Sequence, residues 1–173
     1  MRIVAGEHRG ARIFAPKGRE TRPTSDRVRE AAFNLIGPVD DAAVLDLFAG
    51  SGAMGLEALS RGAASAVFVE SDRDACRVID RNIEKLRVTG ARVVQQDVLR
   101  ALAMDRRTYD LILCDPPYGY PAHDRLAPYL VRALAPEGVL VYETGSREEP
   151  AIEGLSMRTS RRYGAVRLTL FEH

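Results

Sequence analysis

The chain has 173 residues, of which 46% are hydrophobic and 28% are charged. This length is enough for one domain with its own core, and no apolar run approaches the roughly 20 residues that cross a bilayer. The first ten residues, MRIVAGEHRG, lack the apolar segment of a signal peptide, so we expect a cytoplasmic protein with no membrane association.

The net charge of +1 conceals two basic ends around an acidic middle. Residues 1–29 hold eight Lys and Arg against three Asp and Glu, and residues 156–173 hold four against one. The residues between them therefore carry a net charge of −7. Basic ends are typical of proteins that bind polyanions, although scattered surface charge accounts for them equally well.

The first 40 residues predict a small extension ahead of the main domain. Two short apolar stretches around a polar turn are typical of a β-hairpin, and a helix with apolar residues at 3.6-residue spacing follows. Thr24 or Ser25 can cap the start of this helix, and Gly37-Pro38 ends it. The predicted elements are a hairpin of 2–6 with 11–16, a loop over 18–25 and the helix before 37.

From residue 43 to the C-terminus the pattern is that of an α/β domain over 41–173. Alternating strands and helices indicate a doubly wound, mostly parallel sheet covered on both faces. The last two strands meet at Gly164 with no helix between them, so we expect an antiparallel hairpin that completes a seven-stranded sheet. The predicted strands are 43–48, 66–70, 91–96, 109–114, 138–143, 157–163 and 165–172; the helices are 53–62, from 72 to before 90, 98–104, and one containing Leu126, Leu130 and Leu134 that ends at Pro136.

Acids and glycines follow the first four parallel strands. In a doubly wound sheet, ligands bind beyond the carboxyl ends of the strands. The residues at these ends are therefore the candidates for chemistry. They are 46–52, 70–72, Asp97 and 115–118.

The turn after the first strand, Gly50-Ser51-Gly52-Ala53-Met54-Gly55, matches the G-x-G-x-x-G pattern of dinucleotide-binding proteins. Asp46 and Asp97 would repel a pyrophosphate, whereas S-adenosylmethionine carries a sulfonium and an ammonium and no phosphate. We therefore expect S-adenosylmethionine, with Glu70 accepting from the ribose diol and Asp97 from the adenine amine. The predicted cofactor-binding residues are Asp46, Phe48, Gly50, Ser51, Gly52, Glu70, Ser71, Asp97, Val98 and Asp115.

Asp115-Pro116-Pro117-Tyr118 follows the fourth strand, opposite the glycine turn in this topology. Methyl transfer to an exocyclic amine needs acceptors that draw the nitrogen toward sp³ geometry and aim its lone pair at the methyl group. The Asp115 carboxylate and the Pro116 carbonyl can accept the two N–H bonds, and the two prolines hold that carbonyl rigidly. Tyr118 offers a ring on which a base can stack. These four residues are the predicted catalytic residues.

With these motifs in place, the sequence resembles the class I methyltransferases of the D-P-P-Y amino-methylating group, and specifically the bacterial 16S rRNA guanine-N2 methyltransferases of the D type. The resemblance covers almost the whole chain and is carried by RIVAGEHRGARI, TRPTSDRVREAAFNLI, VLDLFAGSGAMGLEALSRGA, VFVES, QQD, DPPY and YGAVRLTLFE. Ser25 and Ala5 stand where threonine and glycine are common in the family.

The resemblance implies a Rossmann-like fold, a monomer, and a partner in 16S rRNA of the small subunit or its assembly intermediates. It implies methylation of N2 of one guanine, guanine 966 in the family. Residues implied at the RNA entrance include Asp26 and Glu30, for which helix capping and ion pairing are an equal alternative. The predicted RNA-binding residues are Arg9, Arg12, Arg22, Thr24, Arg27 and Arg29.

Other interpretations of the sequence remain open. The D-P-P-Y and glycine motifs also occur in amino-methyltransferases that act on other nucleic acids, for example on DNA adenine. An oxidoreductase would leave Asp46, Asp97 and the D-P-P-Y motif without a role, and a non-catalytic RNA-binding module would not need the acids. We expect no metal site, and we expect Cys76 and Cys114 to be free thiols.

Overall fold

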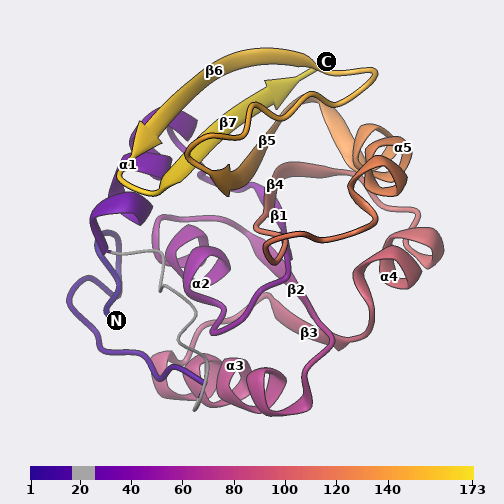
Figure 1. Cartoon of the computed structure of the whole chain (residues 1–173). Coiled ribbons are helices and arrows are strands. Elements are labelled where there is room, and N and C mark those ends of the chain that lie inside the picture. The colour runs from indigo at the N-terminus through magenta and orange to yellow at the C-terminus, as the bar shows by residue number, and fades with distance from the viewer. Residues whose placement is uncertain (17–25) are drawn as a thin grey trace.

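The computed structural model describes residues 1–16 and 26–173. Within them seven strands form one sheet in the order β3-β2-β1-β4-β5-β7-β6, with β1 to β5 parallel and β7 and β6 antiparallel at one edge (Figure 1). The predicted doubly wound sheet and its C-terminal hairpin are therefore confirmed. The elements are α1 Asp26–Ile36, β1 Ala43–Leu47, α2 Ala53–Ser60, β2 Ser65–Glu70, α3 Arg73–Leu86, β3 Ala91–Gln95, α4 Val98–Met104, β4 Tyr109–Cys114, α5 His123–Ala133, β5 Leu134–Gly145, β6 Ser156–Tyr163 and β7 Val166–Glu172.

The sheet separates two hydrophobic clusters, one under each layer of helices. Phe33 of α1, Leu56 of α2 and Ile79 of α3 pack on one face. Leu102 of α4 and Leu126 of α5 pack on the other. Figure 1 shows the same division, with α1, α2 and α3 on one side of the sheet and α4 and α5 on the other. Both faces are covered, which explains why the central strands are almost continuously apolar.

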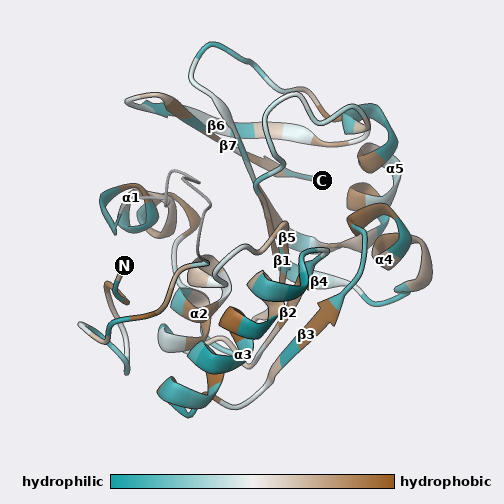
Figure 2. Ribbon diagram, turned by 60° about the horizontal axis from the view of Figure 1, so that its bottom comes forward, coloured by the Kyte–Doolittle hydropathy of each residue, from teal (hydrophilic) through white to brown (hydrophobic). Residues whose placement is uncertain are grey.

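Helix α3 shows how an amphipathic sequence places its apolar stripe. Ile79 is fully buried against the sheet, and α3 is coloured mostly hydrophilic in Figure 2. Asn82 is the buried polar exception, and it donates to the carbonyls of Phe14 and Ser51. Asp72 caps the helix by accepting a hydrogen bond from the backbone N–H of Ala75 at 2.8 Å.

The neighbouring strands β1 and β4 mark the point where the direction of strand addition reverses. The chain first builds outward through β2 and β3 and then crosses to the other side of β1 to form β4 and β5. The loops after β1 and β4 therefore leave in opposite directions and open a crevice at the carboxyl end of the sheet. The glycine turn follows β1 and the Asp-Pro-Pro-Tyr segment follows β4, so both border this crevice.

The boundary between α5 and β5 differs from the prediction. The helix ends at Ala133, and Leu134, which we expected inside it, already pairs with Tyr109 in the sheet. The register then shifts, because the next pair is Leu111 with Val139. Pro136 explains why the regular ladder is interrupted here, since proline has no N–H to donate to it. Leu134 follows the apolar spacing of the helix by coincidence.

The predicted N-terminal hairpin is reduced to one antiparallel bridge between Arg2 and Arg12. The two stretches do run side by side, with Ile3 donating to the carbonyl of Ala11 at 2.9 Å. The N–H groups of Val4 and Ala5, however, donate to the carboxylate of Glu57 on α2. The ladder cannot continue because α2 takes these donors. We call residues 1–16 the N-terminal arm.

Two further predictions concern the ends of elements. The β6–β7 hairpin turns at Gly164, which has a φ of +63°, as expected. The capping of α1 by Thr24 or Ser25 and the preceding loop lie outside the described residues.

Cys76 and Cys114 are both buried, and both are free thiols, as predicted.

Candidate active site

A cavity of about 920 Å³ lies at the carboxyl ends of β1, β2, β4 and β5. Six acidic side chains line it, and its described lining contains no lysine or arginine. Such a cavity suits a ligand that carries positive charge or N–H donors. It does not suit a pyrophosphate. The acidic lining residues are Asp46, Glu70, Asp97, Asp115, Glu143 and Glu148.

Strand alternation directs the first two acids to the same face of the sheet. Asp46 pairs in register with Phe68, which packs in the cluster under α2 and α3. Glu70 lies two residues after Phe68 and therefore faces the same side. Both carboxylates are buried, so the sheet holds them rigidly at the bottom of the cavity.

Asp115 and Glu143 stand next to each other at one level of the sheet. Cys114 of β4 pairs with Tyr142 of the parallel strand β5, and each acid is the next residue along its chain. Neighbouring strands lie about 4.8 Å apart, so the two carboxyl groups begin from adjacent positions. Both line the cavity. We call Asp115 and Glu143 the carboxyl pair.

The glycine turn gives its N–H groups to carboxylates. The N–H of Gly50 donates to Glu70 Oε2 at 2.9 Å, and the N–H of Gly55 donates to Asp46 Oδ2 at 2.9 Å. These are donors that a dinucleotide site would turn toward phosphate. Gly55 is also required for packing, since a Cβ there would lie 2.4 Å from the ring of Phe68. The turn is therefore built around two acids.

Burial, with the charge of neighbouring acids in two cases, raises the pKa values of three carboxyl groups in the cavity. Burial, together with the charges of Asp115 and Glu70, raises the pKa of Asp46 to about 8, against the lowering effect of the Gly55 N–H. Asp115 is open to the cavity but otherwise enclosed by protein, and this loss of water raises its pKa to about 6. Burial and then the charge of Asp115 raise the pKa of Glu143 to about 8. No lysine or arginine of the described residues forms an ion pair with these three carboxyls.

The Asp-Pro-Pro-Tyr segment forms the side of the cavity opposite the glycine turn. Asp115, both prolines and Tyr118 line it, and the side chain of Tyr118 is 70% exposed. The Tyr118 ring lies close to Gly145 of β5, since a Cβ on Gly145 would be 3.4 Å from ring atom Cε1. An exposed ring beside a residue without a side chain leaves space for a flat ligand.

Two further predicted cofactor-binding residues are Phe48, which follows β1, and Asp97, which follows β3. Phe48 has a φ of +59°, which is rare for a residue with a Cβ, and its ring packs edge-on against Tyr120 at 5.1 Å. Asp97 caps α4 by accepting from the N–H of Arg100 at 3.1 Å. The structure brings every predicted cofactor residue except Gly52 into the lining of the cavity. Gly52 lies behind it with a φ of +76°, against Ile79.

The predicted RNA-binding residues are less closely grouped. Arg12 and Arg27 are exposed, as is Arg9. The turn that contains Arg9 is held at the C-terminal end of α2, where the N–H of His8 donates to Ser60 Oγ at 3.0 Å. This is the end of α2 remote from the cavity. Arg22 and Thr24 lie outside the described residues.

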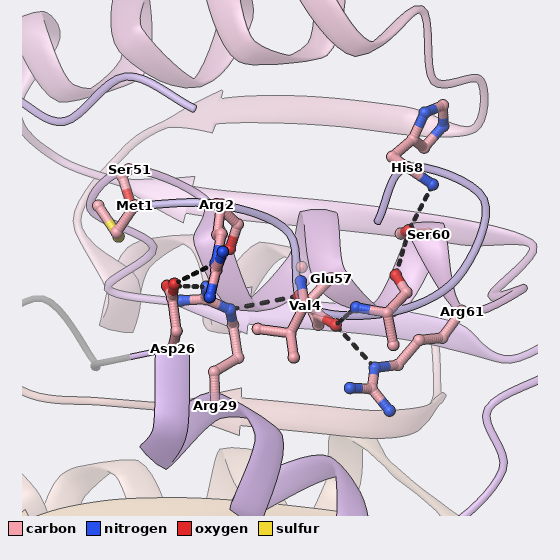
Figure 3. A network of polar contacts seen from close by, with 12 residues as sticks. Met1, Arg2, Val4, His8, Asp26, Arg29, Ser51, Glu57, Ser60 and Arg61 are labelled. Carbon is pink, nitrogen blue, oxygen red and sulfur yellow. Dashed lines mark hydrogen bonds and ion pairs between the residues drawn. The ribbon is translucent and has the colours of Figure 1, made fainter. Parts of the chain in front are cut away.

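Arg29 does not face the solvent. Its side chain is fully buried, and its guanidinium bonds to Asp26 Oδ1 at 2.8 Å and to Glu57 Oε2 at 3.3 Å, and also to the carbonyl of Arg2 (Figure 3). These contacts fasten α1 and the N-terminal arm to α2. We therefore remove Arg29 from the RNA-facing set, and the ion-pairing alternative for Asp26 accounts for its contacts.

Sequence reasoning missed several residues of the cavity. Glu143 ends the predicted strand 138–143, so the rule that selected Asp115 after the fourth strand also selects Glu143 when it is extended to the fifth. Met1, Ala15 and Pro16 reach the cavity from the N-terminal arm. No local sequence signal marks these three, because the fold alone brings the arm there.

The part of the chain that the structure describes holds no group of three or more His, Cys, Asp or Glu arranged to bind a metal ion. In residues 1–16 and 26–173, no helix is long and apolar enough to cross a membrane.

The parallel sheet, the crevice at its reversal point and the acidic cavity define a protein of the Rossmann-like methyltransferase fold. A solved structure described as a putative methyltransferase yhhF from Escherichia coli superposes with a TM-score of 0.89 at 34% identity, covering all of this chain and 97% of that one.

The chain belongs to the family described as Conserved hypothetical protein 95, whose model matches residues 1–172. It is 44% identical over 119 residues to ribosomal RNA small subunit methyltransferase D of Escherichia coli K12, covering 68% of this chain and 60% of that protein. The protein of the same name from Haemophilus influenzae is 30% identical over 182 residues, covering all of this chain and 94% of that protein. The chain thus aligns to less than two thirds of the length of the Escherichia coli relative.

Proposed function

We propose that this protein transfers a methyl group from S-adenosylmethionine to N2 of a guanine in 16S rRNA of the small ribosomal subunit. The observation that carries the proposal is the Asp-Pro-Pro-Tyr segment facing the glycine turn across an acidic cavity. The names of the family's relatives in Escherichia coli and Haemophilus influenzae support an rRNA substrate. The choice of guanine 966 rests on the family resemblance.

The donors and acceptors of the cavity fit S-adenosylmethionine. Its sulfonium and ammonium balance the carboxylates, and no phosphate meets Asp46 or Asp97. Glu70 accepts from the N–H of Gly50 and from that of Asp72 at 2.9 Å each, and its remaining lone pairs can accept from a ribose diol. The other predicted cofactor-binding residues remain part of the proposal, with Phe48 and Val98 beside the nucleoside. Bound S-adenosylmethionine would supply an electrophilic methyl group.

The catalytic roles follow from the position of Asp115. Its carboxylate and the carbonyl of Pro116 accept the two N–H bonds of the amine, which localises the nitrogen lone pair. The lone pair forms the new N–C bond as the C–S bond breaks, and one amine proton leaves toward the Asp115 carboxylate or water. Tyr118 stacks on the base, which must leave its helical stack to enter the cavity.

Residues 1–40 form the RNA-facing extension in this proposal, and residues 41–173 form the catalytic domain. Arg9, Arg12 and Arg27, with Arg22 and Thr24 of the undescribed segment, contact RNA phosphates. The enzyme acts as a monomer in the cytoplasm, on the small subunit or its assembly intermediates.

The test is methylation of small subunits that lack the modification, with tritiated S-adenosylmethionine and mapping of the modified base. The expected product is N2-methylguanine at one position of 16S rRNA. Transfer to DNA adenine and not to rRNA would establish the alternative substrate. Calorimetry that detects NAD binding and no S-adenosylmethionine binding would overturn the cofactor assignment.

A further inference from the structure

We infer that Glu143 determines base specificity, by accepting the N1–H of the target guanine while Asp115 accepts from its N2 amine. This inference deepens the proposed function and rests on it. It concerns the half of the cavity beyond Asp115, where Gly145 of β5 lies close to the ring of Tyr118.

The geometry of the carboxyl pair is its first support. Asp115 and Glu143 continue from the Cys114–Tyr142 pair on adjacent parallel strands, so their side chains start from neighbouring points at one level. Guanine carries two adjacent donors on one edge, N1–H and the N2 amine. Two neighbouring carboxylates complement that edge, with one acceptor for each donor.

The space around the pair is the second support. Gly145 lies two residues after Glu143 on β5, where a Cβ would be 3.4 Å from the ring of Tyr118 and 3.0 Å from Glu148 Oε1. The short distance between β5 and this ring supports a base that stacks on Tyr118 with its edge directed at β5. Glu143 is half-buried there and forms no ion pair with a described lysine or arginine.

The chemistry separates guanine from its closest competitor. Adenine presents an amine beside an unprotonated N1, which is an acceptor and faces a carboxylate unfavourably. A site that hydrogen-bonds one donor rejects an analogue that lacks it, because its own polar group is left unpaired. In the free protein the pKa of Glu143 is raised, and N–H donors opposite the pair favour its ionised form.

The experiment replaces the target guanine with an analogue that lacks the N1–H donor. The target guanine is first mapped with the wild-type enzyme, and small subunits are then reassembled with 2-aminopurine at that position. 2-Aminopurine keeps the amine but has an acceptor at N1, and it also lacks O6, whose loss the Glu143 variants separate from the change at N1. We expect wild-type single-turnover methylation to be about 10- to 100-fold slower on 2-aminopurine than on guanine.

Two variants assign this preference to Glu143. In Glu143→Gln the amide can accept from guanine N1–H or donate to 2-aminopurine N1, so the preference should narrow to within about threefold. Glu143→Ala should lose it similarly. Glu137→Gln removes an exposed charge from the same strand outside the cavity and should retain the wild-type preference. A purely structural role for Glu143 would slow both substrates equally.

The outcomes separate the two proposals. If the wild-type enzyme methylates no guanine, the proposed function fails. If it methylates guanine and Glu143→Gln keeps the full preference, the role of Glu143 is wrong and the function stands. A wild-type enzyme that methylates 2-aminopurine as fast as guanine would likewise overturn the role of Glu143.

Discussion

Two regions of this molecule enclose carboxylates, and they treat them in opposite ways. Glu57 on α2 is fully buried and accepts four hydrogen bonds, from the N–H groups of Val4 and Ala5 and from the guanidinium groups of Arg29 and Arg61 (Figure 3). Asp46, Asp115 and Glu143 of the cavity form no ion pair with a lysine or arginine among the described residues. The first region is a completed network that attaches the N-terminal arm to α2.

The difference shows which charges serve the fold and which await a ligand. A buried ion pair is stable only when each charge is compensated, and Glu57 meets that condition within the chain. In the cavity, burial and mutual repulsion raise the pKa values of Asp46 and Glu143. Such uncompensated acids reduce stability and are typical of functional sites. A cationic cofactor would supply the missing compensation.

The largest expected effect breaks the completed network. Glu57→Ala removes one partner of a buried ion pair and two acceptors for the arm, so we expect the free energy of unfolding to fall by about 3–5 kcal/mol in urea denaturation. The control is Glu84→Ala, an exposed side chain on α3, with a change within about 0.5 kcal/mol. If Glu57→Ala does not fold, Glu57→Gln keeps one acceptor and should be destabilised less. Equal stability of Glu57→Ala and Glu84→Ala would contradict the role of the network.

The next effect tests the cavity side of the comparison. Asp115→Ala should slow single-turnover methylation at saturating cofactor by about 10²–10³, equivalent to about 2.7–4 kcal/mol, because the carboxylate acts mainly in the transition state. Cofactor affinity should fall far less than the rate, since Glu70, Phe48 and Val98, which are proposed to contact the nucleoside, are unchanged. Asp115→Asn should keep part of the activity, because its amide oxygen still accepts one bond. A near-wild-type rate for Asp115→Ala would remove this residue from the mechanism.

The raised pKa of Asp46 predicts how stability depends on pH. Its folded pKa of about 8 exceeds the ordinary 3.8, so the folded protein holds an extra proton between about pH 4 and 8. The stability that the protonated Asp46 contributes to the fold is fully present below the ordinary pKa of 3.8. It is lost as the pH rises through the folded pKa of about 8. When the pH rises from 6 to 8, the free energy of unfolding of the wild type should therefore fall. The free energy of unfolding of Asp46→Asn should fall by about 1–3 kcal/mol less.

Urea denaturation of the cofactor-free protein at the two pH values measures this difference. Asp74→Asn, an exposed acid on α3, is the control and should keep the wild-type dependence. Identical pH dependence in Asp46→Asn and the wild type would show that Asp46 ionises without cost in the fold.

The sequence predicted those features that depend on local pattern and on strand order. Asp46, Glu70 and Asp115 could be selected because the carboxyl ends of parallel strands must meet at one edge. The contacts of the N-terminal arm could not be predicted, because Glu57 is 52 and 53 residues from Ala5 and Val4 in the chain. The burial of Arg29 belongs to the same network, and a helical arginine near other arginines gives no local sign of it.

The boundary at Leu134 shows a different limit. Leu126, Leu130 and Leu134 keep helical spacing, and a local pattern cannot reveal that the third side chain belongs to a strand. The pairing with Tyr109 decides it, and that pairing depends on β4. Tertiary context here overrides local periodicity.

The smallest expected effect distinguishes two arginines on the first turn of α1. Arg27 is exposed, whereas Arg29 is fully buried against Glu57, so only Arg27 can neutralise a phosphate. In a titration of RNA binding against salt, Arg27→Ala should flatten the slope of log K against log[salt] by less than about one unit and leave cofactor affinity unchanged. Arg77→Ala is the matched control, because Asp74 already pairs with this exposed arginine at 3.2 Å and its loss should not change the slope. If Arg27→Ala lowers cofactor affinity and RNA affinity together, the start of α1 has a structural role. The contrast between a buried, paired Arg29 and an RNA-facing Arg27 would then be wrong.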